Sequence, residues 1–186
     1  FQTDIAKHGK NSLAHFGYSL ILARTDNYDD AIDQMKKALE INALEPYFVI
    51  ELARIYFVAG RYPEALDMLV SLEIMAPDHP RRLYYLGRTQ MEMKRYHDAI
   101  DAFEKTIRLY PEYTLVYEHL GMSYGKLGKL GYAHYYLGMY NKRIAKLKTA
   151  ELHLEKALET MNDLEKKDAI NKMLDEIRIK KVQSRH

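Results

Sequence analysis

The stretch LGRTQMEMKRYHDAIDAFEKTIRLYP, residues 86–111, decides the fold because its markers return along the chain. A second stretch, ELARIYFVAGRYPEALDMLVSLEIMAP at residues 51–77, carries the same markers earlier in the sequence. One marker is an alanine three residues after a tyrosine or leucine, found at Ala31, Ala65, Ala99 and Ala133. Another is a small residue twelve positions before each alanine, found at Ser19, Ala53, Gly87 and Gly121. This even spacing predicts an internal repeat of about 34 residues.

Each repeat predicts two helices joined by a short turn. In the third repeat, residues 81–94 and residues 99–109 both place apolar side chains at helical spacing. The few residues between these segments predict an antiparallel pair. Where two helices cross at close range, a side chain larger than alanine would hold the backbones apart. We therefore interpret the recurring alanines, with Gly87 and Gly121, as structural positions of the repeat.

These strings resemble the tetratricopeptide repeat (TPR) family, and the resemblance covers roughly residues 12–160. It implies an all-α fold, a right-handed superhelical solenoid of antiparallel helix pairs with about ten helices. We expect a single array over residues 1–186, with units at about 12–45, 46–79, 80–113, 114–130 and 131–160. A C-terminal capping helix is expected at about 163–182, with Asn162 or Asp163 as its N-cap.

The repeat leaves its register once. After Ala133 the next fitting alanine is Ala150, only half a repeat further on. The helix around residues 132–142 thus has the character of both the second helix of one pair and the first helix of the next.

The composition excludes several classes of protein. The 186 residues include no Cys and 16 Tyr, and 47% are hydrophobic, which is too apolar for disorder. No apolar run approaches the length of a membrane span, and the absence of Cys removes disulfides and thiolate zinc sites. The net charge of +2 argues against a dedicated nucleic-acid binder. The chain opens at Phe1 without a leader pattern, which predicts a processed protein or a piece of a longer one.

No catalytic or metal-binding motif stands out. No two of the eight His have the spacing of HExxH, and GxSxG is absent. The glycine string GKLGKLG at residues 125–131 lacks the phosphate-loop pattern and falls on a predicted turn between helices. We expect no catalytic residue, no metal, no cofactor and no enzyme activity in this chain.

The TPR resemblance also implies that the first helix of each unit lines a concave groove that holds a protein or peptide. The candidate groove residues are Tyr47, Arg54, Tyr84, Arg88, Met122, Tyr135, Met139, Lys142 and Arg143. Tyr and Arg are the residues that binding hot spots favour. TPR clamps for acidic chaperone tails use a Lys, Asn, Asn, Lys, Arg set, and Arg81 alone keeps the required charge here. The other four positions are Phe16, Leu20, Glu51 and Tyr85, which disfavours chaperone tails.

Charge is unevenly distributed along the chain. Residues 29–78 sum to −6, whereas residues 119–150 hold six bases, no acid and several tyrosines. This second stretch is interpreted first as a solvated basic face with packing tyrosines. An acidic protein patch is the sharper hypothesis, and a single-stranded nucleic acid is the less favoured one.

Two further stretches, at residues 13–32 and 45–66, are similar to the C-terminal TPR region of BepA-like bacterial zinc metallopeptidases, and residues 133–159 have the look of that group's last repeats. This narrower resemblance implies a substrate-recruiting or regulatory module in the periplasm or cell envelope, with the catalytic domain outside this chain. Without it, we expect a cytoplasmic, non-catalytic scaffold that binds a peptide or protein. Homo-oligomerisation is possible under either hypothesis, and neither includes membrane insertion.

Overall fold

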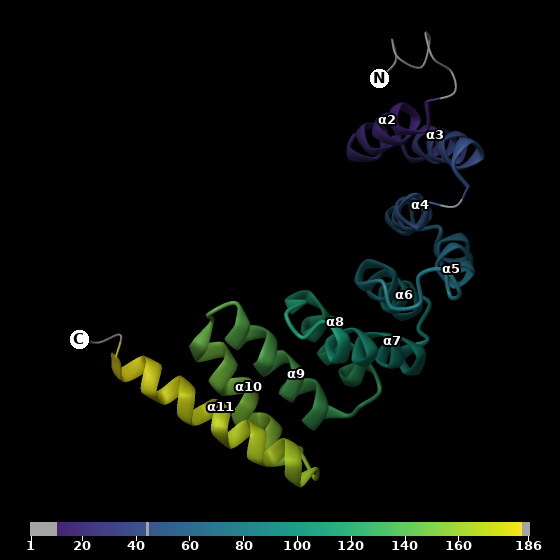
Figure 1. Cartoon of the computed structure of the whole chain (residues 1–186). Helices are drawn as coiled ribbons and strands as arrows, with labels where there is room; N and C mark the ends of the chain where they lie inside the picture. Colours follow the sequence, from purple (N-terminus) through teal and green to yellow (C-terminus); the bar gives the residue numbers. More distant parts are fainter. Residues whose placement is uncertain (1–10, 44, 184–186) are drawn as a thin grey trace. The chain divides into compact units, whose positions relative to one another are not determined.

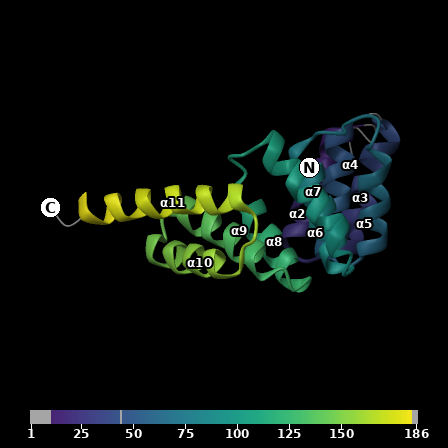
Figure 2. The same cartoon turned by 90° about the horizontal axis from the view of Figure 1, so that it is seen from below.

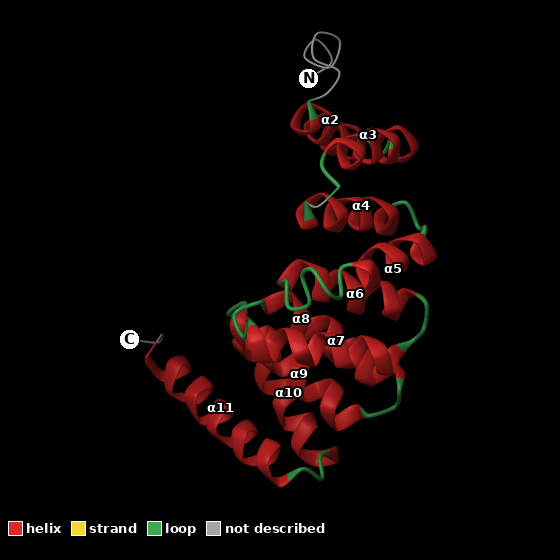
Figure 3. Ribbon diagram, turned by 45° about the vertical axis from the view of Figure 1, so that its right-hand side comes forward, coloured by secondary structure: helices red, strands yellow, loops and turns green. Residues whose placement is uncertain are grey.

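The computed structural model describes residues 11–43 and 45–183, and over these ranges it contains ten helices and no strand (Figure 3). Among the described helices, none is both long enough and apolar enough to cross a bilayer. The chain divides into two compact units, residues 1–93 and residues 94–186, and each is described by itself. The fold is all-α, as predicted.

The first unit consists of two helix pairs and a fifth helix. Its elements are α2 (Ser12–Arg24), α3 (Tyr28–Ile41), α4 (Pro46–Val58), α5 (Tyr62–Ser71) and α6 (Pro80–Glu92). The Asn11 side chain accepts a hydrogen bond from the Ala14 amide and caps α2, while proline stands at the start of α4 and of α6. Figure 1 shows α2 beside α3, and turns of a few residues connect the helices within each pair.

Small residues allow the helices of the first unit to approach closely. Ala31, Ala53 and Ala65 are completely buried, and the Ser19 hydroxyl donates a hydrogen bond of 2.7 Å to the carbonyl oxygen of Ala31. Phe16 of α2 stacks on Phe48 of α4 with ring centroids 4.6 Å apart. The recurring small residues therefore have the structural role that the repeat predicts.

The second unit consists of α7 (Tyr96–Leu109), α8 (Thr114–Lys126), α9 (Leu130–Arg143), α10 (Leu147–Thr160) and α11 (Leu164–Gln183). Ala99 is completely buried here and Ala133 nearly so. Gly121 is required because a Cβ at this position would lie 2.8 Å from Cγ of Leu137. The capping helix α11 packs Ile170, Leu174 and Ile177 against α10, and Figure 2 shows it running beside this helix. Asp163 is its N-cap, because its carboxylate accepts a hydrogen bond from the Lys166 amide.

The turns between paired helices share one backbone feature, a residue in the left-handed region. Asp26, Gly60, Lys94 and Gly128 have φ between 58° and 74° and follow one another at the spacing of the repeat. Ala145 has φ 60° and follows Gly128 after only half a repeat, the same short step that separates Ala150 from Ala133. The turn between α9 and α10 is therefore of the within-pair type. Helix α9 ends one pair and begins the next, which agrees with the shift in register seen in the sequence.

The unit boundary falls in the turn between α6 and α7, inside the third predicted repeat. The single array over residues 1–186 and its right-handed superhelical winding stay predictions.

Candidate functional site

Three helices of the first unit surround a pocket of about 390 Å³, which we call the arginine pocket. Helices α2, α4 and α6 contribute its lining residues, which are Leu20, Arg24, Tyr47, Glu51, Arg54 and Arg81. These are alternate helices along the chain, the first members of their pairs. The repeat therefore brings together positions from three successive units that lie far apart in the sequence.

Glu51 is the acidic centre of the arginine pocket. Its side chain is only 3% exposed and forms ion pairs with two arginines. Arg54, one turn further along α4, donates from Nε to the carboxylate at 2.6 Å. Arg81 of α6 pairs with the same carboxylate and also donates a hydrogen bond of 2.8 Å to the Tyr47 hydroxyl. A buried carboxylate needs such partners, and here two guanidinium groups supply them.

Arg24 completes the pocket without a partner of its own. It is exposed, and no hydrogen bond or ion pair joins it to another described residue. Three arginines face one glutamate, so the lining carries two uncompensated positive charges. Guanidinium groups bind carboxylate and phosphate through paired hydrogen bonds. The arrangement can therefore hold an anionic group beside an exposed tyrosine ring.

The structure separates the four groove candidates of the first unit. Tyr47 and Arg54 line the arginine pocket, whereas Tyr84 and Arg88 do not. Tyr84 is only 6% exposed, because its ring packs against Tyr85 and beneath the guanidinium of Arg88. Arg88 is half-buried, with its guanidinium 4.4 Å from the ring centroid of Phe57. The Tyr84 ring is therefore buried against neighbouring side chains of α6 and is not exposed as a binding surface, and a partner-binding role for Tyr84 stays a prediction.

The second unit has a tyrosine-lined pocket of about 330 Å³, here called the tyrosine pocket. The groove candidates Tyr135 and Met139 both line it, and burial raises the pKa of Tyr135. The other lining residues are Ile107, Tyr117, Tyr136, Glu165, Lys166 and Ala169. Met122 of α8 lies outside this pocket and is exposed.

Lys142 and Arg143, expected to face a partner, are engaged within the second unit. The Lys142 ammonium forms an ion pair of 2.5 Å with Glu176 of α11. Arg143 donates a hydrogen bond of 2.9 Å to the Tyr117 hydroxyl and lies 4.3 Å from the centroid of that ring. The remaining basic residues of this stretch divide between the two ends of α9, since Lys126 and Lys129 precede its start and Lys146 and Lys148 follow its end.

The tyrosines of this stretch mostly pack on one another. Tyr124 stacks on Tyr132 and on Tyr136 with ring centroids 5.0 and 5.5 Å apart. The Tyr124 hydroxyl donates a hydrogen bond of 2.6 Å to Glu104, and burial together with this bond raises the pKa of Tyr124. Stacked, buried rings of this kind are not available to stack on bases, which supports the packing interpretation of these tyrosines.

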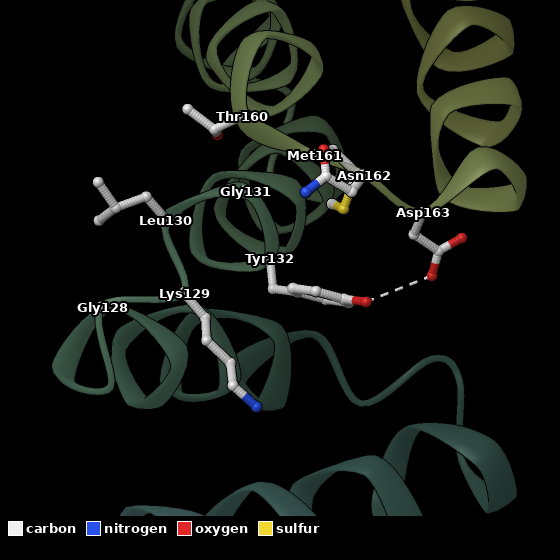
Figure 4. A pocket seen from close by; sticks show the side chains of 9 residues that line it. All are labelled: Gly128, Lys129, Leu130, Gly131, Tyr132, Thr160, Met161, Asn162 and Asp163. Carbon is white, nitrogen blue, oxygen red and sulfur yellow. Dashed lines mark hydrogen bonds between the residues drawn. The ribbon is translucent and has the colours of Figure 1, made fainter.

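A third pocket, of about 450 Å³, lies where the α8–α9 turn meets the loop between α10 and α11 (Figure 4). One polar pair lies in its wall, since the Tyr132 hydroxyl donates to Asp163, which also holds Lys166. Gly131 is required for close packing, because a Cβ there would lie 3.1 Å from the backbone of Met161. The lining of this third pocket holds one base and one acid, Lys129 and Asp163, whereas that of the arginine pocket holds three bases and one acid. Because of this surplus of positive charge, we favour the arginine pocket as the functional site.

Within the described ranges, no group of three or more His, Cys, Asp or Glu is placed to hold a metal ion. One histidine pair, His134 of α9 and His153 of α10, was not expected from the sequence. Burial lowers the pKa of both imidazoles, and the charge of Lys156 lowers both further. The glycine string at residues 125–131 forms the turn between α8 and α9, with Gly128 at φ 72°.

The sequence does not predict Arg24 as a groove residue, and it indicates Glu51 and Arg81 only as positions of the chaperone-tail clamp. The available signal was the repeat itself, because Leu20 and Arg54 are separated by one repeat and so are Tyr47 and Arg81. Equivalent positions of successive first helices line one surface.

Comparison with known proteins identifies the fold. The family model of anaphase-promoting complex, cyclosome, subunit 3 matches residues 24–106. A search of curated proteins finds no match to the sequence. None of the matches named here is a metallopeptidase, so the narrower resemblance to BepA-like proteins stays a prediction.

Three solved structures illustrate the likeness. The crystal structure of MamA protein is 20% identical, with a TM-score of 0.63, over 82% of this chain and 92% of that one. YrrB, described as a TPR protein with an unusual peptide-binding site, is 18% identical, with a TM-score of 0.61, over 92% of this chain and 97% of that one. TTC0263, a thermophilic TPR protein of Thermus thermophilus, is 20% identical, with a TM-score of 0.59, over 88% of this chain and 99% of that one. Together with the repeated helix pairs and their recurring left-handed turns, these likenesses establish that the chain has the tetratricopeptide-repeat fold.

Proposed function

We propose that this chain is a non-catalytic protein-interaction module that binds an acidic segment of a partner protein at the arginine pocket. The observation that carries the proposal is the charge of this pocket, which is lined by three arginines and one buried glutamate. The internal carboxylate satisfies Arg54 and Arg81, and Arg24 remains open for an anionic group from outside.

The neighbouring surface suits a peptide chain. The Tyr47 ring is 39% exposed at the pocket wall, and its hydroxyl is held by Arg81. A fixed aromatic ring offers contact area with little rotamer entropy to lose, while Arg24 supplies charge. Binding should weaken as ionic strength rises, because the exposed arginine is screened by salt.

The tyrosine pocket is the second surface for such a partner. Tyr135 and Met139 offer an aromatic and a flexible apolar side chain, and Met122 is 44% exposed on α8. We assign these residues to apolar contacts with the same class of partner. Lys142 and Arg143 act there through their contacts with Glu176 and Tyr117, which order the surrounding helices.

A random peptide array tests the proposal. Wild-type protein is expected to select peptides enriched in Asp and Glu, and Arg24→Glu is expected to abolish this enrichment. Lys36→Glu is the matched control, because Lys36 is an exposed base of the same unit on α3, outside the pocket. A selected set without acidic bias, or one that Arg24→Glu leaves unchanged, would show that the arginine pocket is not the binding site.

A further inference from the structure

Two imidazole rings meet in the seam between α9 and α10. The Nδ1 atoms of His134 and His153 are 2.9 Å apart, and the ring centroids are 5.2 Å apart. Both side chains are half-buried, so the pair can be reached from solvent. The third pocket and the tyrosine pocket do not include either histidine.

Glycines hold the two helices close together on both sides of this pair. Gly131, His134 and Gly138 are spaced by three and four residues and therefore lie on one face of α9. A Cβ at Gly131 would lie 3.1 Å from the backbone of Met161, and one at Gly138 would lie 2.7 Å from Leu154. The spacing between the two helices at the histidines is thus set by close backbone packing on either side of them.

The separation of the two Nδ1 atoms is that of a hydrogen bond, and it also equals the distance between two nitrogen ligands that bind one metal ion at a right angle. Imidazole nitrogens bind such ions at about 2.0–2.1 Å, so neighbouring ligands at a right angle lie about 2.9 Å apart. A tetrahedral angle would instead require about 3.3 Å at the same bond length. Right-angle nitrogen ligands are typical of Cu²⁺ and Ni²⁺, for which imidazole is a suitable ligand.

We infer that His134 and His153 form a two-imidazole binding site for a divalent transition metal ion of the copper or nickel type. In the metal-free protein, one neutral imidazole donates its Nδ1 proton to the other. In the metal-bound protein, that proton moves to Nε2 of the same ring, and both Nδ1 lone pairs bind the ion. No net release of a proton is needed, because both rings stay neutral.

The surroundings predict an exchangeable site and not a structural one. No third His or acidic ligand completes the site among the described residues, so water fills the remaining positions. The positive charge of Lys156 acts on both imidazoles and opposes the binding of a metal ion. The negative charge of Glu159 acts on His134 and favours a bound cation. Affinity should therefore be moderate.

Calorimetric titration of the tag-free protein with Ni²⁺ at neutral pH tests this site. His134→Gln and His153→Gln are each expected to weaken Ni²⁺ binding by at least about tenfold, because each removes one of two ligands. His97→Gln is the control, since His97 is exposed on α7 of the same unit. Circular dichroism of each variant confirms that the helices are retained, and electron paramagnetic resonance of the Cu²⁺ form should show two equatorial nitrogens.

Two results would overturn the inference. One is the absence of Ni²⁺ binding at millimolar metal in the folded wild type. The other is an affinity that one or both substitutions leave at the level of His97→Gln, because the ion would then be held by single histidines elsewhere.

Discussion

Arg81 of α6 forms an ion pair with Glu51 of α4, and the Glu51 side chain is almost completely withdrawn from solvent. Arg54 holds the other carboxylate oxygen at 2.6 Å. The three side chains link two first helices of the repeat and shape the wall of the arginine pocket. An acidic side chain buried in this way is stable only while cationic partners surround it.

Replacing both Arg54 and Arg81 by Met should lower the free energy of unfolding by about 3–5 kcal/mol, because it leaves the buried Glu51 charge uncompensated. Adding Glu51→Gln to the double variant should recover much of this loss, since the amide carries no charge. Urea unfolding at neutral pH measures all three proteins. A triple variant no more stable than the double variant would mean that the carboxylate is not the source of the instability.

Replacing each of two glycines of the second unit by alanine should change the free energy of unfolding in opposite directions. At Gly138 the added Cβ would lie 2.7 Å from the completely buried Leu154, so Gly138→Ala should destabilise by about 1–3 kcal/mol. At Gly125, within α8, the nearest atom would be the Ala133 Cβ at an ordinary 3.7 Å. Gly125→Ala should therefore stabilise by up to about 1 kcal/mol through the lower backbone entropy of the unfolded chain. Thermal melts of the two variants compare them directly, and a shift of the same sign in both would be inconsistent with this packing.

Stability at low pH should depend on Asp163, the N-cap of α11. Hydrogen bonds from the amide and the ammonium of Lys166 lower the pKa of this carboxyl from its ordinary value of 3.8. A carboxyl with a lowered pKa stabilises the folded state above its ordinary pKa, and this contribution is lost as the pH falls through the folded-state value. Asp163→Asn should therefore reduce the urea midpoint at pH 7, and the gap to wild type should narrow as the solution is acidified below about pH 4.

The control for Asp163 is Asp168→Asn, which alters an exposed acid of the same helix. This variant should stay close to wild type at every pH. A gap between Asp163→Asn and wild type that is equally large at neutral and acidic pH would argue against a charged cap.

The helices and their register could be predicted from the sequence because the spacing of the repeat constrains both. Each recurring alanine is buried, and each left-handed turn falls five residues before it. The shift in register after Ala133 could be predicted for the same reason. Ala145 lies five residues before Ala150, as each earlier left-handed residue does before its alanine. The periodicity of the sequence predicts such positions well, because each of them has one steric requirement, either a small side chain or a left-handed backbone.

The side-chain pairing within the sites could be predicted only in part. The repeat placed Tyr47 and Arg54 at one surface, but it could not show that Glu51 is buried between two arginines. It likewise gave no sign that Lys142 meets Glu176 or that His134 meets His153. These contacts depend on rotamers and on small differences in helix separation, which hydrophobic spacing does not encode.

The most direct test of the account is a double-mutant cycle between Arg24 and an acidic residue of a peptide selected on the array. Calorimetry gives the affinities of wild type and Arg24→Ala for this peptide and for its version with the acid changed to the amide. We predict a coupling energy of at least about 1 kcal/mol, which decreases as salt is added. A coupling energy of zero at low salt would contradict the assignment of the arginine pocket as the site that recognises an acidic partner.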